Sequence, residues 1–300
     1  MGLSGPGGSG PAAPRNRPPT GAIDVSAAAK PRPRSEVLLR ALRPLTDALV
    51  VPLGRTGMDP QAIVLTHASL GMLAALLVAA GPSSWLWAAL LLQCKTLLDN
   101  LDGGVARATG RVTRMGRYLD TVLDMLVNLL LFAALALHGP GLWAWPLAAL
   151  AALVLTLVLS LDFVLEGRYT ALRGRDVTPD DDLPIGAPLP LYRLVRGIYQ
   201  LVLAPQDRAL TRLDARLFRR LAGVSEARAA LDVRLAWSDL FSTGTLVNLG
   251  LSTQLLVLGL CLVLGVPFAY VYFVLASGLY VLLVQGLRAW RFRRYLGAGA

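Results

Sequence analysis

Four aspartates lie close together in the chain, and their spacing divides them into two pairs. They bound the run DNLDGGVARATGRVTRMGRYLDTVLD, which extends from Asp99 to Asp124. Asp99 and Asp102 are three residues apart, and Asp120 and Asp124 are four apart, so each pair would share one face of a helix. Carboxylates are costly near a membrane, and neither helix packing nor orientation calls for four of them. The run is therefore the first candidate for chemistry.

The two pairs can meet if they belong to antiparallel neighbouring helices, because the link between them is short. Four carboxylates in one cavity would repel each other strongly unless cations lay among them. Oxygen ligands at that density suit Mg²⁺ or Mn²⁺. The sequence thus predicts a divalent metal site that holds a phosphate at the membrane boundary.

Small residues and one arginine separate the two aspartate pairs. Gly103, Ala106 and Gly116 would let a nucleotide or phosphate approach the backbone closely. Arg107 could clamp phosphate oxygens with its planar guanidinium group. Each also has an ordinary explanation, since small residues commonly serve helix packing and arginines beside a membrane commonly set its topology.

Three further polar residues lie in the flanking apolar runs. Lys95 shares a helical face with Asp99 and Asp102, so it either neutralises a carboxylate, contacts a substrate phosphate, or extends to the cytoplasmic interface. Thr66 and His67 lie early in the preceding apolar run, where either could form a hydrogen bond between helices.

The composition is that of a membrane protein. Hydrophobic residues make up 55% of the chain and charged residues 16%, well above the apolar share of a soluble domain. Cys94 and Cys261 both lie in apolar runs, so we expect buried thiols and no disulfide framework.

Six apolar runs are each long enough to cross the bilayer as a helix. We therefore expect an all-α, polytopic membrane protein, preceded by an amphipathic surface helix over 36–52 that is interrupted or bent near Pro44. The six runs are 61–80, 84–101, 118–137, 142–165, 242–264 and 267–287.

The positive charge lies on one side of these runs. The chain has a net charge of +10 and 29 lysine and arginine residues, and all but Lys95 lie before residue 61, in 102–117, in 167–240 or after residue 287. The positive-inside rule then places both termini and the aspartates in the cytoplasm. We expect an integral protein of the bacterial cell (inner) membrane whose charge meets anionic lipid, with no nucleic acid as partner.

Two segments lie outside the membrane runs. Residues 1–35 are rich in Gly, Pro and Ala, which predicts a disordered tail, and 36–300 form the membrane domain. A basic insertion over 167–240 begins with a loop around Asp180–Asp182. One or two amphipathic helices follow within 191–235, and the apolar face expected for them consists of Leu191, Leu194, Val195, Ile198, Tyr199 and Val202.

The aspartate run resembles the signature of the CDP-alcohol phosphotransferases, also called CDP-alcohol phosphatidyltransferases. Its pattern D-x-x-D-G-x-x-A-R-x8-G-x3-D-x3-D is complete in this chain. The resemblance covers roughly 36–165 and 242–287. Two features depart from the family: Pro60-Gln61 replaces a frequent Pro-Asn, and the 167–240 insertion is longer than in compact members. The residues that match the signature are Asp99, Asp102, Gly103, Ala106, Arg107, Gly116, Asp120 and Asp124.

The resemblance implies a mechanism and a set of partners. Asp99, Asp102 and Asp120 would hold a pair of Mg²⁺ or Mn²⁺ ions with the CDP diphosphate. Asp124 would be the general base on the acceptor hydroxyl and could also bind a metal. The nucleotide site would be lined by Gly103, Ala106 and Gly116, with Arg107 beside it. The expected partners are a CDP-linked lipid or alcohol, an acceptor alcohol, membrane lipids and a second copy of the chain.

The signature describes the CDP half of the reaction and leaves the rest open. The leading hypothesis is transfer of a phosphatidyl, or other substituted phosphate, group from a CDP-alcohol such as CDP-diacylglycerol to a small polar alcohol, with release of CMP. The alternatives are transfer of a CDP-linked polar head group to a lipid acceptor, a divalent-cation transporter and an inactive paralogue. Arg168, Arg173 and Arg175 either meet an anionic acceptor or only set the topology.

Overall fold

The computed structural model describes residues 37–174 and 189–298, and these form helices and no strand. The expected tail over 1–35 and the loop around Asp180–Asp182 lie outside the described residues. Four helices are long and apolar enough to span a membrane. A fifth span is present if one pair of helices joined at a bend is counted as a single span. The all-α membrane architecture is confirmed, whereas the number of six spans stays a prediction.

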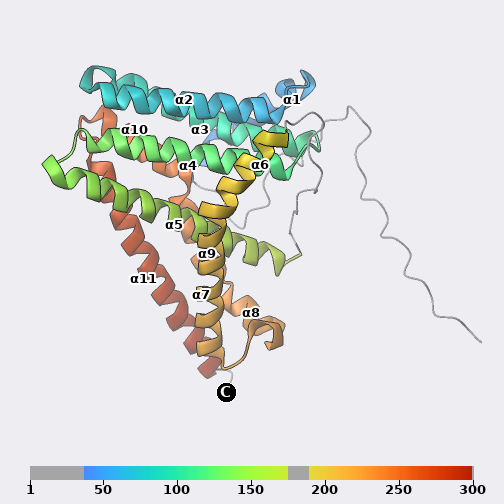
Figure 1. Ribbon diagram of the computed structural model, residues 1–300. Coiled ribbons are helices and arrows are strands. Elements are labelled where there is room, and N and C mark those ends of the chain that lie inside the picture. Colours follow the sequence, from blue (N-terminus) through green and yellow to red (C-terminus); the bar gives the residue numbers. More distant parts are fainter. Residues whose placement is uncertain (1–36, 175–188, 299–300) are drawn as a thin grey trace, which may run out of the picture.

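Three helices side by side carry the aspartate run and its surroundings (Figure 1). They are α2 (Pro60–Ala80), α3 (Trp85–Ala108) and α4 (Arg114–Ala136), and α2 packs against both others. Asp59 caps α2 by accepting a hydrogen bond from the Gln61 amide, and Pro60 occupies its first turn. This is a favourable helix start because proline has no amide hydrogen to leave unbonded.

Helix α3 was expected to span the membrane, but it is not one of the four helices that are apolar enough to do so. The reason is that Lys95, Asp99 and Asp102 lie within it. It also runs past the expected end at residue 101 to Ala108. The helix continues through Gly103 and Gly104 and ends before Gly110, whose φ of 68° is in the left-handed region that favours glycine. Gly103 and Arg107 are therefore on the helix and not in a link.

The other spans complete the bundle. Helix α5 (Ala144–Ala171) packs on α4 and on α11 (Ala269–Ala298). The run expected as one span over 242–264 is divided into α9 (Leu240–Leu246), a 3₁₀ turn η6 (Val247–Leu249) and α10 (Leu251–Val263), with a bend of 40°. The break leaves backbone carbonyls without helical partners, and the side-chain amide of Gln254 donates a hydrogen bond to one of them, that of Leu249, at 3.3 Å.

The short links between spans meet at the end of the bundle away from the aspartates. His138 Nε2 lies 2.8 Å from the carbonyl oxygen of Val78, and Trp85 packs edge-on against the His138 ring. A Cβ added to Gly139 would come within 2.4 Å of Phe268. The uncharged links therefore share one side, as the distribution of positive charge predicts.

The N-terminal helix packs on protein at its second half. Helix α1 (Val37–Arg55) includes both Pro44 and Pro52, so it is not interrupted at Pro44, and the alternative of a bend there stays a prediction. Val50 is buried against α3, where a Cβ on Gly104 would come within 2.9 Å of it. Leu45, by contrast, remains exposed.

The part of the insertion that follows residue 188 is helical and docks on the spans (Figure 1). It comprises α6 (Leu189–Ile198), a π-helical segment η4 (Tyr199–Leu203), α7 (Ala204–Ala222), a short turn η5 (Glu226–Arg228) and α8 (Leu231–Trp237). Part of the predicted apolar face packs on the spans, since Val195, together with Leu203, lies in one cluster with Val64 of α2 and Leu119 of α4. Leu191, Leu194 and Val202 of the predicted face are exposed.

Candidate metal centre

Three of the four aspartates surround one histidine. His67 on α2 is fully buried, and its Nε2 lies 3.2 Å from Asp102 Oδ2, 3.5 Å from Asp120 Oδ1 and 3.9 Å from Asp99 Oδ1. Asp99 and Asp102 come from one face of α3, and Asp120 comes from α4. The structure thus brings the two predicted pairs together across the interface of three helices.

Local helix geometry explains this convergence. Helix α4 begins at a Thr113 cap, whose side-chain oxygen accepts a hydrogen bond from the Gly116 amide at 3.0 Å. Serine or threonine at this position is favoured because it satisfies an amide that the first turn leaves unbonded. The cap fixes where the helix starts, and Asp120 then lies one turn after Gly116, on the side that faces α3.

The fourth aspartate has a different partner. Asp124 Oδ1 lies 2.6 Å from the Nζ atom of Lys95, whose side chain is 1% exposed. Lys95 therefore neutralises a carboxylate and does not extend to the interface. Gly71 of α2 makes room for the pair, because a Cβ there would lie 3.1 Å from Lys95 Cδ and 2.6 Å from Val127 Cγ1.

The cluster fits a divalent metal ion. One ligand atom from each of His67, Asp99, Asp102 and Asp120 lies within 4.8 Å of all the others. Among the described residues, Asp120 Oδ1 is buried and has no hydrogen-bond partner, although His67 is close by. The three carboxylates, one of which has an oxygen without a hydrogen-bond partner, provide the ligand atoms and the negative charge that a hard cation requires.

Comparison with known proteins gives the family. Residues 60–204 match CDP-alcohol phosphatidyltransferase. The chain carries a domain of the CDP-alcohol phosphatidyltransferase family. Both the resemblance expected from the aspartate run and the enzyme class of transferase are thereby confirmed at the level of the family.

Individual relatives match over parts of their length. The chain is 43% identical over 93 residues to the bifunctional IPC transferase and DIPP synthase of Aquifex aeolicus, which is 30% of this chain and 21% of that protein. It is 33% identical over 121 residues to the phosphatidylinositol phosphate synthase of Cutibacterium acnes, which is 38% of this chain and 55% of the relative. An archaetidylinositol phosphate synthase of Aeropyrum pernix is 33% identical over 108 residues, 33% of this chain and 52% of the relative. The chain thus spans about half or less of these relatives.

The remaining residues of the family signature lie around the cluster on α3 and α4. Arg107 lies over Gly103 on the same face of α3, where an added Cβ would come within 3.0 Å of its Nη1. The Gly103 amide donates to Asp102 Oδ1, and Ala106 is half-buried one turn from Asp102. A Cβ added to Gly116 would lie 3.2 Å from the hydroxyl oxygen of Thr113. Binding of a nucleotide by these residues stays a prediction.

Two arginines that were candidates for an anionic acceptor are engaged elsewhere. Arg168 forms ion pairs with Asp214 of α7 and, at 3.0 Å, with Glu226. Arg173 donates to the carbonyls of Tyr169 and Ser238 and lies 3.6 Å over the Tyr169 ring. Arg175 lies outside the described residues. Both described arginines therefore tie the insertion to the end of α5.

Sequence reasoning did not include His67 among the site residues. The signals available were its place in an otherwise apolar run and the presence of only two histidines in the chain. A pair of carboxylates on α5, Asp162 and Glu166, also escaped notice, although they are four residues apart and both are buried. The partners of His67 lie on other helices, which spacing within one helix does not reveal, whereas the spacing of Asp162 and Glu166 was visible in the sequence.

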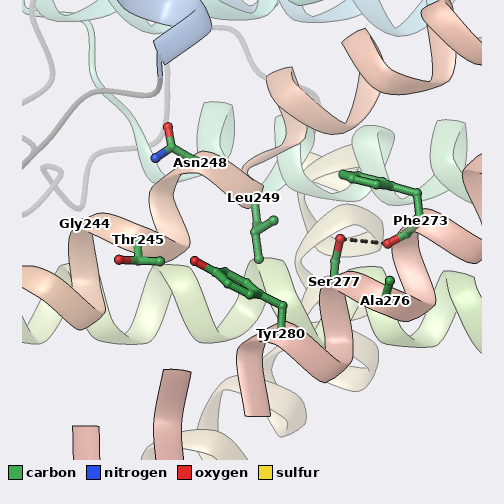
Figure 2. A pocket seen from close by; sticks show the side chains of 8 residues that line it. All are labelled: Gly244, Thr245, Asn248, Leu249, Phe273, Ala276, Ser277 and Tyr280. Carbon is green, nitrogen blue, oxygen red and sulfur yellow. Dashed lines mark hydrogen bonds between the residues drawn. The ribbon is translucent and has the colours of Figure 1, made fainter. Parts of the chain in front are cut away.

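A separate cavity lies away from the metal centre, where α9 and η6 face α11 (Figure 2). It has a volume of about 440 Å³. None of its lining residues is charged, and none belongs to the aspartate run or to α2, so it does not form part of the metal centre. The residues that line it are Gly244, Thr245, Asn248, Leu249, Phe273, Ala276, Ser277 and Tyr280.

Proposed function

We propose that this protein transfers a phosphatidyl group from a CDP-alcohol to a small polar alcohol, with release of CMP, in phospholipid synthesis. The observation that carries the proposal is the convergence of three signature carboxylates, from α3 and α4, on one buried point. The family supports the reaction class. The donor we propose is CDP-diacylglycerol, because the site lies at the end of membrane-spanning helices where a lipid-linked diphosphate would be presented.

An inositol phosphate is the acceptor that we propose to test first. The names of two relatives, a phosphatidylinositol phosphate synthase and an archaetidylinositol phosphate synthase, support this choice. The exposed arginines at the start of α4, Arg114 and Arg117, offer positive charge beside the cluster. An arginine side chain binds phosphate oxygens well because its planar group presents paired donors.

In this mechanism the aspartates have two roles. Asp99, Asp102 and Asp120 would hold the Mg²⁺ or Mn²⁺ ions, which supply positive charge to the diphosphate when bound. Asp124 accepts the proton of the acceptor hydroxyl. The hydroxyl oxygen then forms a bond to the β-phosphorus, the bond from that phosphorus to the CMP oxygen breaks, and CMP leaves with the electron pair.

The other residues orient the reactants. Lys95 holds the Asp124 carboxylate in place through the 2.6 Å ion pair. Gly103, Ala106 and Gly116 would leave space for the nucleotide against the helix backbones, and Arg107 would bind its phosphate oxygens. Asp124 could also ligate a metal, which its proximity to Asp120 on α4 allows.

Location and assembly complete the proposal. We place the site and both termini on the cytoplasmic side of a bacterial inner membrane, because the charged segments lie there by the positive-inside rule. The chain would work as a homodimer in contact with membrane lipids. Strictly monomeric behaviour with full activity, measured by mass photometry in nanodiscs, would contradict the dimer.

The reaction is tested with the full chain in nanodiscs. Purified protein with Mg²⁺ or Mn²⁺ is given CDP-diacylglycerol and a panel of alcohols that includes inositol phosphate, inositol, glycerol phosphate and serine. We expect CMP release and a new phospholipid, detected by mass spectrometry, with one acceptor only. The Asp120→Asn variant and a reaction without acceptor serve as controls, and CMP release that persists unchanged in Asp120→Asn would contradict the proposal.

A further inference from the structure

The histidine at the centre of the cluster comes from a helix that the family signature does not include. His67 lies on α2, and its side chain is 0% exposed. Among the described residues, Nδ1 has no hydrogen-bond partner, and the contacts of the ring with the three aspartates are all made by Nε2. That nitrogen therefore faces three carboxylate oxygens from two other helices.

The separations are short enough for the atoms to share one metal ion, and the shortest of them is also that of a hydrogen bond between His67 and Asp102. In an octahedral site with ligands about 2.1 Å from the ion, neighbouring donors lie about 3.0 Å apart and opposite donors about 4.2 Å apart. The distances from His67 Nε2 to Asp102, Asp120 and Asp99 are 3.2, 3.5 and 3.9 Å. All three fall between the two limits.

We propose that His67 Nε2 is a direct ligand of an ion held by Asp99, Asp102 and Asp120. The inference rests on the metal centre of the proposed function and adds a nitrogen to its oxygen ligands. Imidazole suits transition metals, whereas Mg²⁺ strongly prefers oxygen. The mixed ligand set therefore favours Mn²⁺ over Mg²⁺ at this position.

The chain offers a direct spectroscopic test because it has only two histidines. His138 lies at the opposite end of the bundle, beside Val78. In the His138→Gln variant, His67 is the only imidazole, and the glutamine can retain a hydrogen bond to the Val78 carbonyl. This protein is prepared in nanodiscs with ordinary or ¹⁵N-labelled histidine and loaded with Mn²⁺ at one equivalent.

Electron spin-echo modulation of the bound Mn²⁺ then reports its ligands. We expect ¹⁴N modulation with unlabelled protein and its replacement by ¹⁵N modulation after histidine labelling. Bound Mn²⁺ without nitrogen modulation, or ¹⁴N modulation unaffected by the label, would overturn ligation by His67 while leaving the aspartate site intact. Failure to bind Mn²⁺ at all would overturn the metal centre of the proposed function as well.

A second measurement compares metal affinities without any assay of activity. By calorimetry, His67→Gln should bind Mn²⁺ at least about tenfold more weakly, as expected when a metal site loses a ligand or its support, while binding of Mg²⁺ changes less. The His138→Gln variant should match the natural protein for both ions. Equal losses for Mn²⁺ and Mg²⁺ in His67→Gln would contradict the proposed nitrogen preference.

Discussion

The charged residues of the site form two groups, a cluster around His67 and an ion pair deeper in the helix bundle. Asp99, Asp102 and Asp120 gather around His67, whereas Asp124 is held by Lys95 one turn further along α4. Identical side chains thus have different electrostatic surroundings. Substituting them one at a time should separate binding from chemistry.

The first prediction concerns the aspartates. Asp99→Asn, Asp102→Asn and Asp120→Asn should each weaken both metal and CDP-lipid binding, because each removes a negative ligand from a cation site. Asp124→Asn should retain much of the CDP-lipid affinity and lower turnover by about 10²–10⁴-fold, the usual effect of losing a general base. Binding is measured by calorimetry and turnover by CMP release. Equal loss of CDP-lipid binding in Asp124→Asn and Asp99→Asn would make Asp124 a metal ligand.

The second prediction concerns Lys95. Lys95→Met leaves Asp124 buried without its cation, and breaking a buried ion pair from one side costs about 3–5 kcal/mol. The melting temperature in nanodiscs should therefore fall. In Lys95→Met combined with Asp124→Asn, the charge is gone, so stability should recover while activity stays lost. Recovery of activity in the double variant would exclude Asp124 as the base.

At the scale of elements, the insertion is tied to the spans at two places. Near the site, the ring of Tyr199 of η4 packs at a tilt on that of Tyr118 of α4, with the ring centroids 4.7 Å apart, and the Tyr199 hydroxyl donates to Asp207. Burial, and then the Asp207 carboxylate, raise the pKa of Tyr199, so the phenol stays protonated and can donate. The second tie is Asp214 of α7, which Arg168 of α5 and Arg288 of α11 both contact, Arg288 at 2.6 Å.

The third prediction tests the tie at Asp214. Asp214→Asn leaves two arginines close together in a buried place without their shared anion, so α7 should detach more readily. Limited proteolysis within 204–240 should become faster, and the melting temperature should fall. Asp232→Asn is the matched control, since Asp232 is exposed and, within the described part of the chain, accepts a single hydrogen bond, from Tyr295. Equal proteolysis of both variants would show that Asp214 does not anchor the insertion.

For the whole molecule, the fourth prediction concerns orientation. After replacement of Cys94 and Cys261, a cysteine at Ser83 should react with an impermeant reagent from outside intact cells, and one at Ser225 should not. Ser83 lies between α2 and α3, at the end opposite the aspartates, and Ser225 lies in the charged insertion. Labelling in the reverse pattern would place the metal centre outside the cytoplasm.

The sequence was informative where the pattern is local. Long apolar runs predict the helices, and spacings of three and four predict that Asp99 and Asp102, or Asp120 and Asp124, share a face. Contacts between segments that are distant in the sequence could not be predicted from such patterns. His67 belongs to a different helix from its aspartates, and Asp214 meets arginines 46 residues earlier and 74 residues later in the numbering. The break at Gly250 also escaped prediction, although Thr245, Asn248 and Gly250 interrupt the apolar run there.

The charges of α3 bear on how the chain enters the membrane during synthesis. A lysine or aspartate near the middle of a lone helix costs about 2.5–3.5 kcal/mol on insertion by the translocon, and α3 carries Lys95, Asp99 and Asp102. We expect α3 to remain at the translocation channel until α4 emerges, because Asp124 is then available to Lys95. Insertion of α2, α3 and α4 as one group would thus assemble the candidate metal centre before the second half of the protein has been made.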